Sequence, residues 1–229
     1  PFSNSLLLQD SSSKLGFSPK YTNKLAQELK DGIGSLGALI TYHRTDSNVM
    51  KTSEIKKLRS IIESQHGKSM LSNPQNFFKE RSKFVQQGHE AVTPININKK
   101  PYEIKDFLSA DQFKLYDLIW KRTYASQMSS SINLETTFKI KSNKIFLKAT
   151  GNIQKFKGFK EVYNFSESSD ELQNLPDCKN KESLYLIDVN SKQNFTKPPN
   201  RFSEAGLIKK LEELGIGRPS TYVSIFTKL

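Results

Sequence analysis

The sequence predicts an α+β protein with more than one domain, in which helical regions flank a β-rich module. Apolar residues recur at helical spacing in three stretches of the first 128 residues: within 1–30, from Ser53 to Gly67 and from about Ser109 to Met128. From about residue 132 the pattern changes to alternation, as at Phe138 and Ile140, which are separated and followed by lysines. Helical spacing returns after Pro198, where adjacent prolines remove ladder donors and mark a boundary. With 229 residues, the chain has room for one large domain or two small ones.

The first region is predicted to begin with two helices within residues 1–30, separated by Leu15-Gly16-Phe17. Ser18 is the expected N-cap of the second helix, and Pro19 its first residue. The remaining elements expected in this region are a short apolar strand at 38–42, a helix capped by Ser53 and a long amphipathic helix from about Ser109 to Met128.

The β-rich module is expected to hold about 70 residues, with further strands at Phe156–Tyr163 and Leu184–Val189. A helix should then run from about Ser203 to Leu214, with Leu207, Leu211 and Leu214 aligned on one face. Gly215-Ile216-Gly217 forms a turn, and Pro219 is expected to start a final helix. This order is typical of a helix-turn-helix.

Charge and composition restrict the function classes. Lys and Arg number 35 against 23 Asp and Glu, a net charge of +12, which favours a polyanionic partner. The sequence lacks a run of about 18 apolar residues, so no membrane span is expected. A lone Cys178 excludes an internal disulfide and a zinc site of several cysteines, and the three histidines lack helical i, i+4 spacing. No metal site is therefore predicted in this sequence.

A glycine-rich segment, Gly32 to Gly37, matches the letters of a dinucleotide-binding motif. That motif requires a strand before the loop and a helix after it, whereas the order predicted here is helix, loop, strand. We therefore interpret it as a connecting loop.

The segment Thr41-Tyr42-His43-Arg44-Thr45-Asp46-Ser47 carries the most chemistry. In an extended backbone, Tyr42 and Arg44 share one face and His43 points to the other. A phenol beside a guanidinium suits covalent phosphoryl transfer, because the cation favours phenolate and the guanidinium fork grips phosphate oxygens. A packed tyrosine beside a solvated arginine is the other interpretation, and the spacing alone favours it.

Two further segments have polar side chains of interest. His89 is either a hydrogen-bond donor to phosphate or an ordinary surface histidine. Arg218, Ser220 and Thr221 follow a glycine turn, and they form either a phosphate-binding helix start or a plain turn. The lysines of the β-rich module suit DNA backbone attraction, and a solvated sheet face explains them nearly as well.

Taken together, these segments resemble the bacterial type IA DNA topoisomerases. The Thr41–Ser47 segment is similar to the active-site motif of that family, with His43 where Met is usual. A second departure is Thr93, where the family usually has Arg. Further landmarks match the family in order along nearly the whole chain: Pro1 to Phe17, His89-Glu90-Ala91, Leu115 to Met128 and Phe195 to Tyr222.

The resemblance implies the roles of individual residues. Tyr42 would be the nucleophile that takes a 5′-phosphate of one DNA strand, Arg44 would contact the scissile phosphate, and His89 would lie beside them. Arg44 and three residues after the glycine turn would contact DNA: Arg218, Ser220 and Thr221.

The resemblance also implies the architecture and the setting. It implies a winged-helix-like domain with the tyrosine (1–127), a β-rich arch domain (128–198) and the start of a helical DNA-groove domain (199–229). The substrates would be single-stranded and negatively supercoiled DNA, relaxed without ATP by a monomer in the bacterial cytoplasm, at the nucleoid. Mg²⁺ is expected for the full-length enzyme but not for this stretch, which has no Asp-x-Asp pair. Both ends look internal to a longer protein, and the stretch alone should be inactive.

Two other function classes compete with this interpretation. A non-catalytic basic helix-turn-helix module would bind nucleic acid with Tyr42 merely packed. A tyrosine recombinase would require several arginines and histidines around the tyrosine, and the arginines of this chain are few and scattered. The test is whether Tyr42, Arg44 and His89 share one surface.

Overall fold

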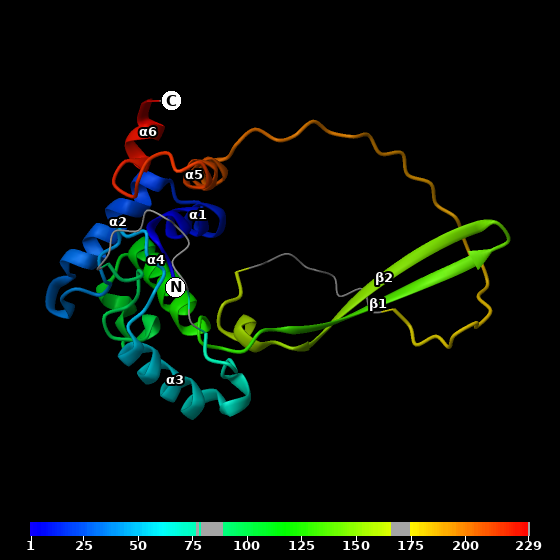
Figure 1. Cartoon of the computed structure of the whole chain (residues 1–229), viewed down its shortest axis with the longest axis horizontal. Coiled ribbons are helices and arrows are strands. Elements are labelled where there is room, and N and C mark those ends of the chain that lie inside the picture. Colours follow the sequence, from blue (N-terminus) through cyan, green and yellow to red (C-terminus); the bar gives the residue numbers. More distant parts are fainter. Residues whose placement is uncertain (77, 79–88, 166–174, 229) are drawn as a thin grey trace. The chain divides into compact units, whose positions relative to one another are not determined.

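The computed structural model describes residues 1–76, 78, 89–165 and 175–228, and the chain divides into two compact units (Figure 1). The helical unit comprises residues 1–131, 157–165 and 202–229. The hairpin unit comprises residues 132–156 and 166–201. Helices combined with a small antiparallel sheet confirm the predicted α+β class. The division into three domains stays a prediction.

Local signals at the start of the chain define two helices, α1 (Asn4–Leu15) and α2 (Pro19–Asp31). The hydroxyls of Ser3 and Ser18 accept hydrogen bonds from the first turns of these helices. Gly16 ends α1 in a left-handed conformation with φ of 70°. The predicted pair of helices and the caps of α2 are therefore confirmed.

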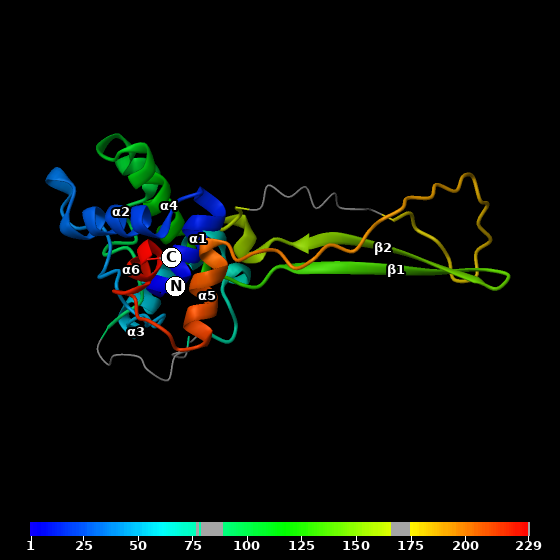
Figure 2. The same cartoon turned by 90° about the horizontal axis from the view of Figure 1, so that it is seen from above.

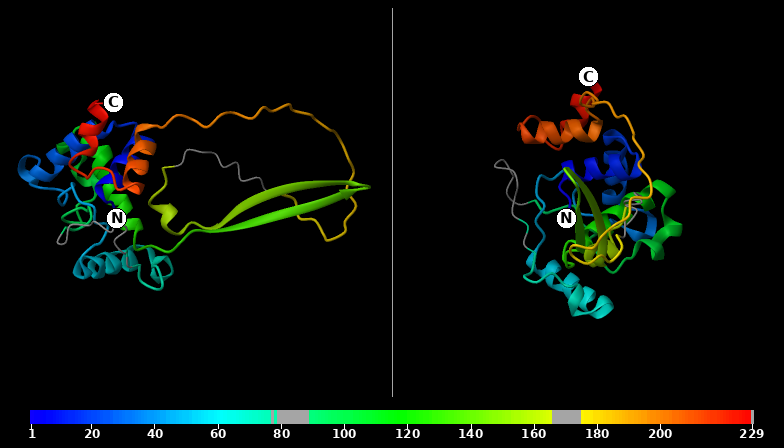
Figure 3. Two further views of the ribbon diagram at one scale, coloured as in Figure 1. Left: turned by 45° about the horizontal axis from the view of Figure 1, so that its top comes forward. Right: turned by 90° about the vertical axis from the view of Figure 1, so that its right-hand side faces the viewer.

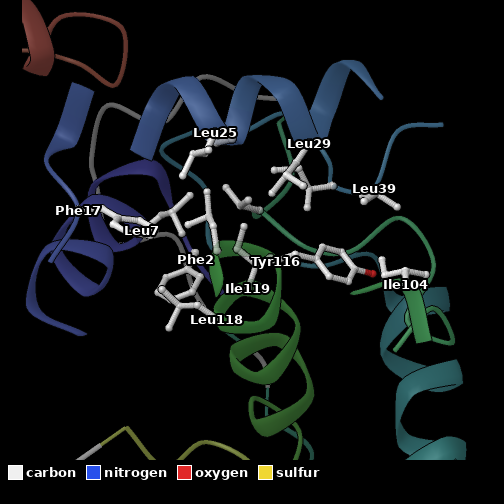
Figure 4. Close-up of a cluster of buried hydrophobic side chains, with 14 of the residues drawn as sticks. Phe2, Leu7, Phe17, Leu25, Leu29, Leu39, Ile104, Tyr116, Leu118 and Ile119 are labelled. Carbon is white, nitrogen blue, oxygen red and sulfur yellow. The ribbon is translucent and has the colours of Figure 1, made fainter. Parts of the chain in front are cut away.

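The main core lies between α1, α2 and α4 (Ala110–Ala125). In Figure 4, Leu25 and Leu29 of α2 point toward Phe2, Leu7 and the side chains of α4. Tyr116 of α4 is fully buried, and its hydroxyl donates to the Lys99 carbonyl at 2.8 Å. Burial of these apolar side chains is the main stabilising contribution to the unit.

Two predicted helix boundaries are wrong. Helix α3 (Thr52–His66) begins directly after Lys51, so Ser53 lies inside its first turn and does not cap it. Helix α4 ends at Ala125 rather than at Met128, because the Ser126 hydroxyl donates to the Thr123 carbonyl and the backbone continues as a turn. In Figure 1 and Figure 3, α3 lies on the opposite side of the helical unit from α5 (Glu204–Glu213).

The strand predicted at 38–42 is absent as a regular element. Within the described residues, Ile40 makes one antiparallel bridge to Pro94, and no ladder follows. Pro94 has no N–H group, so the pairing cannot extend through it as a ladder. The segment is extended nevertheless, and Leu39 donates to the Leu29 carbonyl at 2.8 Å.

The described sheet is a two-stranded hairpin of β1 (Ile132–Ser142) and β2 (Ile145–Phe156), which Asn143 links with φ of 51°. Its register places Phe138 opposite Ala149 on one face and Lys139 opposite Lys148 on the other. The further strands predicted at Phe156–Tyr163 and Leu184–Val189 are wrong. Residues Gly158–Glu161 form a 3-10 helix, and Leu184–Val189 has no strand partner among the described residues.

Helices α5 and α6 (Tyr222–Lys228) pack on α1, and Figure 2 shows α5 beside α1. Leu8, Ile208 and Tyr222 form a separate buried cluster at this contact. The buried face of α5 therefore differs from the predicted face of Leu207, Leu211 and Leu214, because Ile208 is buried whereas Leu214 is 59% exposed. Pro219 does not start the last helix, which begins three residues later, after a turn. Within the described residues, no helix combines the length and apolar character that a membrane crossing requires.

Gly158 should be intolerant of any side chain. It has φ of +51°, and a Cβ atom there would lie 2.5 Å from the carbonyl oxygens of Ser129 and Ser130. We expect Gly158→Ala to lower the free energy of unfolding by about 2–4 kcal/mol, from backbone strain plus overpacking. Gly16→Ala is the matched control, with φ of +70° and open space around its Cβ, and should cost about 1 kcal/mol. Equal losses in chemical denaturation would contradict this account.

Candidate active site

Five of the six residues singled out from the sequence line one pocket of about 190 Å³ in the helical unit. The sixth, Thr221, is not among the lining residues. Among the described residues, the lining is Tyr42, Arg44, Asp46, His89, Arg218, Pro219 and Ser220.

The Tyr42 segment alternates between exposed and buried side chains. Tyr42 is 45% exposed and Arg44 is also exposed, whereas His43 and Thr45 are buried. Tyr42 and Arg44 therefore share a face with His43 opposite, as predicted, although the segment belongs to no regular strand. An exposed Tyr42 lies on the pocket surface instead of packing into the core.

His89 lies beside the tyrosine. The rings of Tyr42 and His89 meet edge to face, with centroids 5.6 Å apart. This distance places the imidazole at the pocket wall next to the phenol, where a polar group of substrate would meet both.

Hydrogen bonds hold the His89 segment against the Tyr42 segment. The Thr41 hydroxyl donates to the Ala91 carbonyl at 2.8 Å and accepts from the Thr93 N–H at 3.0 Å. The Thr41 N–H donates to the Thr93 carbonyl at 2.9 Å. Thr93 acts in these contacts through its backbone, so a residue other than the usual Arg preserves them.

Arg218 reaches the pocket from a turn between α5 and α6. The Thr221 hydroxyl accepts from the Arg218 N–H at 2.8 Å, and the Thr221 N–H donates to the Arg218 carbonyl at 2.8 Å. Thr221 therefore shapes the turn, while Arg218 and Ser220 face the pocket. Tyr222 anchors the turn below by its burial against Leu8.

Asp46 also lines the pocket; from the sequence we expect it either to orient Arg44 or to cap the segment that follows. Burial raises the pKa of its carboxyl, and the nearby guanidinium of Arg218 opposes that increase. Its position two residues beyond Arg44 was the available signal, since alternation places it on the same side. Asp46 adds one negative charge to a pocket that contains two arginines.

His43 is fully buried behind the pocket, and neither ring nitrogen has a hydrogen-bond partner in the part of the chain that the structure describes. Burial, together with the nearby charges of Arg44 and Lys30, lowers its pKa to about 4, and Asp31 partly opposes them. The imidazole is therefore neutral at physiological pH and serves as a packing group.

The pocket combines a nucleophilic hydroxyl with groups that stabilise negative charge. A phenol oxygen can attack phosphorus, and two guanidinium groups can hold the oxygens of the phosphate. The described residues contain no group of three or more His, Cys, Asp or Glu arranged to hold a metal ion. The chemistry that this arrangement can support is covalent phosphoryl transfer to a tyrosine, assisted by arginine.

Comparisons with known proteins show the family of this chain. The family model described as DNA topoisomerase matches residues 1–229. The chain is 43% identical to DNA topoisomerase 1 of Rickettsia felis, over 100% of this chain and 30% of the relative. It is 40% identical to DNA topoisomerase 1 of Xylella fastidiosa, over 100% of this chain and 29% of that protein.

A solved structure is also similar. The full-length topoisomerase I of Thermotoga maritima aligns with a TM-score of 0.78 and 32% identity, over 100% of this chain and 37% of that one. The chain belongs to the DNA topoisomerase family. It spans about 30% of the length of the curated relatives named above.

Acid should destabilise the fold through His43. The imidazole titrates near 6.5 when unfolded and at about 4 when folded, so the unfolded state binds more protons between these values. Its contribution to the free energy of unfolding is complete above pH 6.5 and is lost as the pH falls to about 4. At about 1.4 kcal/mol per pKa unit, the loss is about 3 kcal/mol.

His43→Met should remove this part of the acid sensitivity, measured by urea denaturation between pH 7.5 and 4. His66→Gln is the control, because His66 is partly exposed beside Glu161, and it should retain most of the pH dependence. An unchanged pH dependence in the His43→Met protein would show that His43 does not titrate as described.

Proposed function

We propose that this chain carries the strand-cleaving tyrosine of a type IA DNA topoisomerase, and that the tyrosine is Tyr42. The observation that supports this most strongly is the shared pocket of Tyr42, Arg44, His89 and Arg218, drawn from segments far apart in the sequence. A non-catalytic helix-turn-helix module gives no reason for a half-exposed tyrosine beside two arginines.

In the proposed reaction, the Tyr42 oxygen attacks a backbone phosphorus of one DNA strand. A bond forms between the Tyr42 oxygen and the phosphorus as the bond from that phosphorus to the 3′ oxygen breaks. The phosphate stays on the 5′ end of the broken strand, and the leaving oxygen takes a proton to become a 3′-hydroxyl. Passage of a strand through the break and the reverse reaction then relax negative supercoils. The phosphodiester energy is retained in the phosphotyrosine bond, so the cycle needs no ATP.

The pocket residues would divide the remaining work. Arg44 and Arg218 would hold the phosphate oxygens and offset the charge that develops on them. His89 would hydrogen-bond to a phosphate or to the departing sugar oxygen. Ser220 would contact the DNA backbone, and Thr221 would support that contact through the turn that it caps.

The full-length enzyme is expected to use Mg²⁺, and the described residues do not fit such a site, since they offer no carboxylate cluster. The ion would bind residues outside this chain, and we expect the 229 residues alone not to relax DNA. In this proposal the helical unit includes the winged-helix-like and groove domains, and the hairpin belongs to the arch. The enzyme would act as a monomer on single-stranded and negatively supercoiled DNA, at the nucleoid in the cytoplasm.

Tyr42→Phe in the full-length enzyme should abolish covalent cleavage of end-labelled single-stranded DNA. The change removes one oxygen and keeps the ring, so folding and non-covalent binding should stay nearly intact. Tyr21→Phe is the matched control, because Tyr21 is 37% exposed and bonds to Asp111, away from the pocket. A folded Tyr42→Phe protein that still forms the adduct would place the nucleophile elsewhere.

Arg218→Ala should weaken non-covalent binding of a single-stranded oligonucleotide by about tenfold, because a charge-assisted hydrogen bond contributes about 1.5 kcal/mol or more. Arg201→Ala removes the same charge from an exposed residue outside the pocket and should change affinity much less. Fluorescence anisotropy with both changes in the Tyr42→Phe background separates binding from cleavage. Equal losses of affinity in the two variants would contradict a specific role for Arg218 in binding.

A further inference from the structure

Arg44 projects from a short stretch of backbone whose carbonyls on both sides are held by one residue, Asn4. The Asn4 side-chain amide donates to the His43 carbonyl at 3.0 Å. The Asn4 N–H donates to the Thr45 carbonyl at 2.8 Å. The two carbonyls belong to the residues on either side of Arg44, so the backbone is anchored directly before and directly after this residue.

The start of α1 explains the second of these bonds. The first N–H groups of a helix have no partner inside it, and Asn4 is the first residue of α1. The Ser3 hydroxyl accepts from the Leu6 N–H, which leaves the Asn4 N–H for the Thr45 carbonyl. The Tyr42 segment therefore helps to cap α1, and α1 in turn fixes the segment.

The orientation of the Asn4 amide is itself fixed. Asn4 is 0% exposed, and its Nδ2 also donates to the Asn23 Oδ1 on α2 at 3.2 Å. With Asn23 accepting one N–H and His43 the other, the amide nitrogen has both donors engaged. Buried hydrogen bonds of this kind hold a backbone more rigidly than exposed ones.

We propose that Asn4 is a positioning residue for Arg44, whose side-chain amide sets the backbone from which the guanidinium reaches the scissile phosphate. This inference rests on the proposed function, since it assigns Asn4 to the same cleavage site. Asn4 would not touch DNA. Its effect would pass through Arg44.

The test is a double-mutant cycle in the full-length enzyme, with single-turnover cleavage of an oligonucleotide as the readout. Asn4→Ala removes the side-chain bonds and keeps the N–H bond to Thr45. A displacement of about 1 Å at a catalytic group can cost about 100-fold in rate, so we expect a loss of about 10- to 100-fold with little change in oligonucleotide affinity. In an Arg44→Lys background, where no guanidinium remains to be placed, the same change should cost about threefold or less.

Two controls separate positioning from folding. Asn23→Ala removes one acceptor of the Asn4 amide and keeps the bond to His43, so it should cost less than Asn4→Ala. Leu25→Ala destabilises the core that α2 helps to form, and its loss of rate should be similar in both Arg44 backgrounds. If Asn4→Ala does not fold, Asn4→Ser takes its place, since its hydroxyl is shorter than the amide and should give the same dependence on Arg44.

Equal losses from Asn4→Ala in the unchanged and the Arg44→Lys backgrounds, or no loss at all, would overturn the positioning role. The proposed function fails differently, because then Arg44→Lys alone would leave the cleavage rate unchanged. A loss that appears in oligonucleotide affinity rather than in rate would also overturn the inference, since it would assign Asn4 to binding.

Discussion

The pocket depends on contacts that helix α1 makes with other segments, both at its first residue and near its middle. Its first residue, Asn4, bonds to the backbone on either side of Arg44. One turn later, Leu8 packs against Ile208 and Tyr222, next to the turn that presents Arg218. One helix therefore holds two parts of the pocket that are more than 170 residues apart in the sequence. The unpaired N–H groups at a helix start make such an attachment favourable, because a carbonyl from another segment satisfies them.

A second set of hydrogen bonds holds the Tyr42 segment on the N-terminal side of Tyr42. Thr41 and Thr93 exchange backbone and hydroxyl bonds, which brings His89 beside Tyr42. The Tyr42 segment is thus fixed before and after its two functional residues, while their side chains remain exposed. In the proposed reaction, a fixed backbone with exposed side chains would favour transition-state stabilisation, because the charges would then need little reorganisation.

Sequence patterns correctly predicted the features that depend only on residues close together in the sequence. Caps such as Ser18 and the alternation of Tyr42, His43 and Arg44 follow from local rules, and the structure confirms both. The strand at 38–42 was wrong because its partner contains Pro94, and the strand at 184–189 was wrong because alternation cannot supply a neighbouring strand. The start of the last helix at Pro219 was also wrong, since a turn intervenes.

The sequence predicted the residues of the candidate site but not the contacts that hold their backbone in place. Tyr42, Arg44 and His89 were singled out from their motifs, whereas Asn4 gives no local signal, because its role exists only once α1 lies against the Tyr42 segment. Asp46 stood within the motif, and its place in the pocket required the position of Arg218.

The central claim is that Tyr42 forms the covalent link to DNA. The direct measurement is to trap the adduct between the full-length enzyme and a single-stranded oligonucleotide, digest the protein and identify the modified peptide by mass spectrometry. The account predicts one nucleotide-bearing peptide, the one that contains Tyr42, linked to a 5′-phosphate. An adduct on another residue, or a link to a 3′-phosphate, would contradict it.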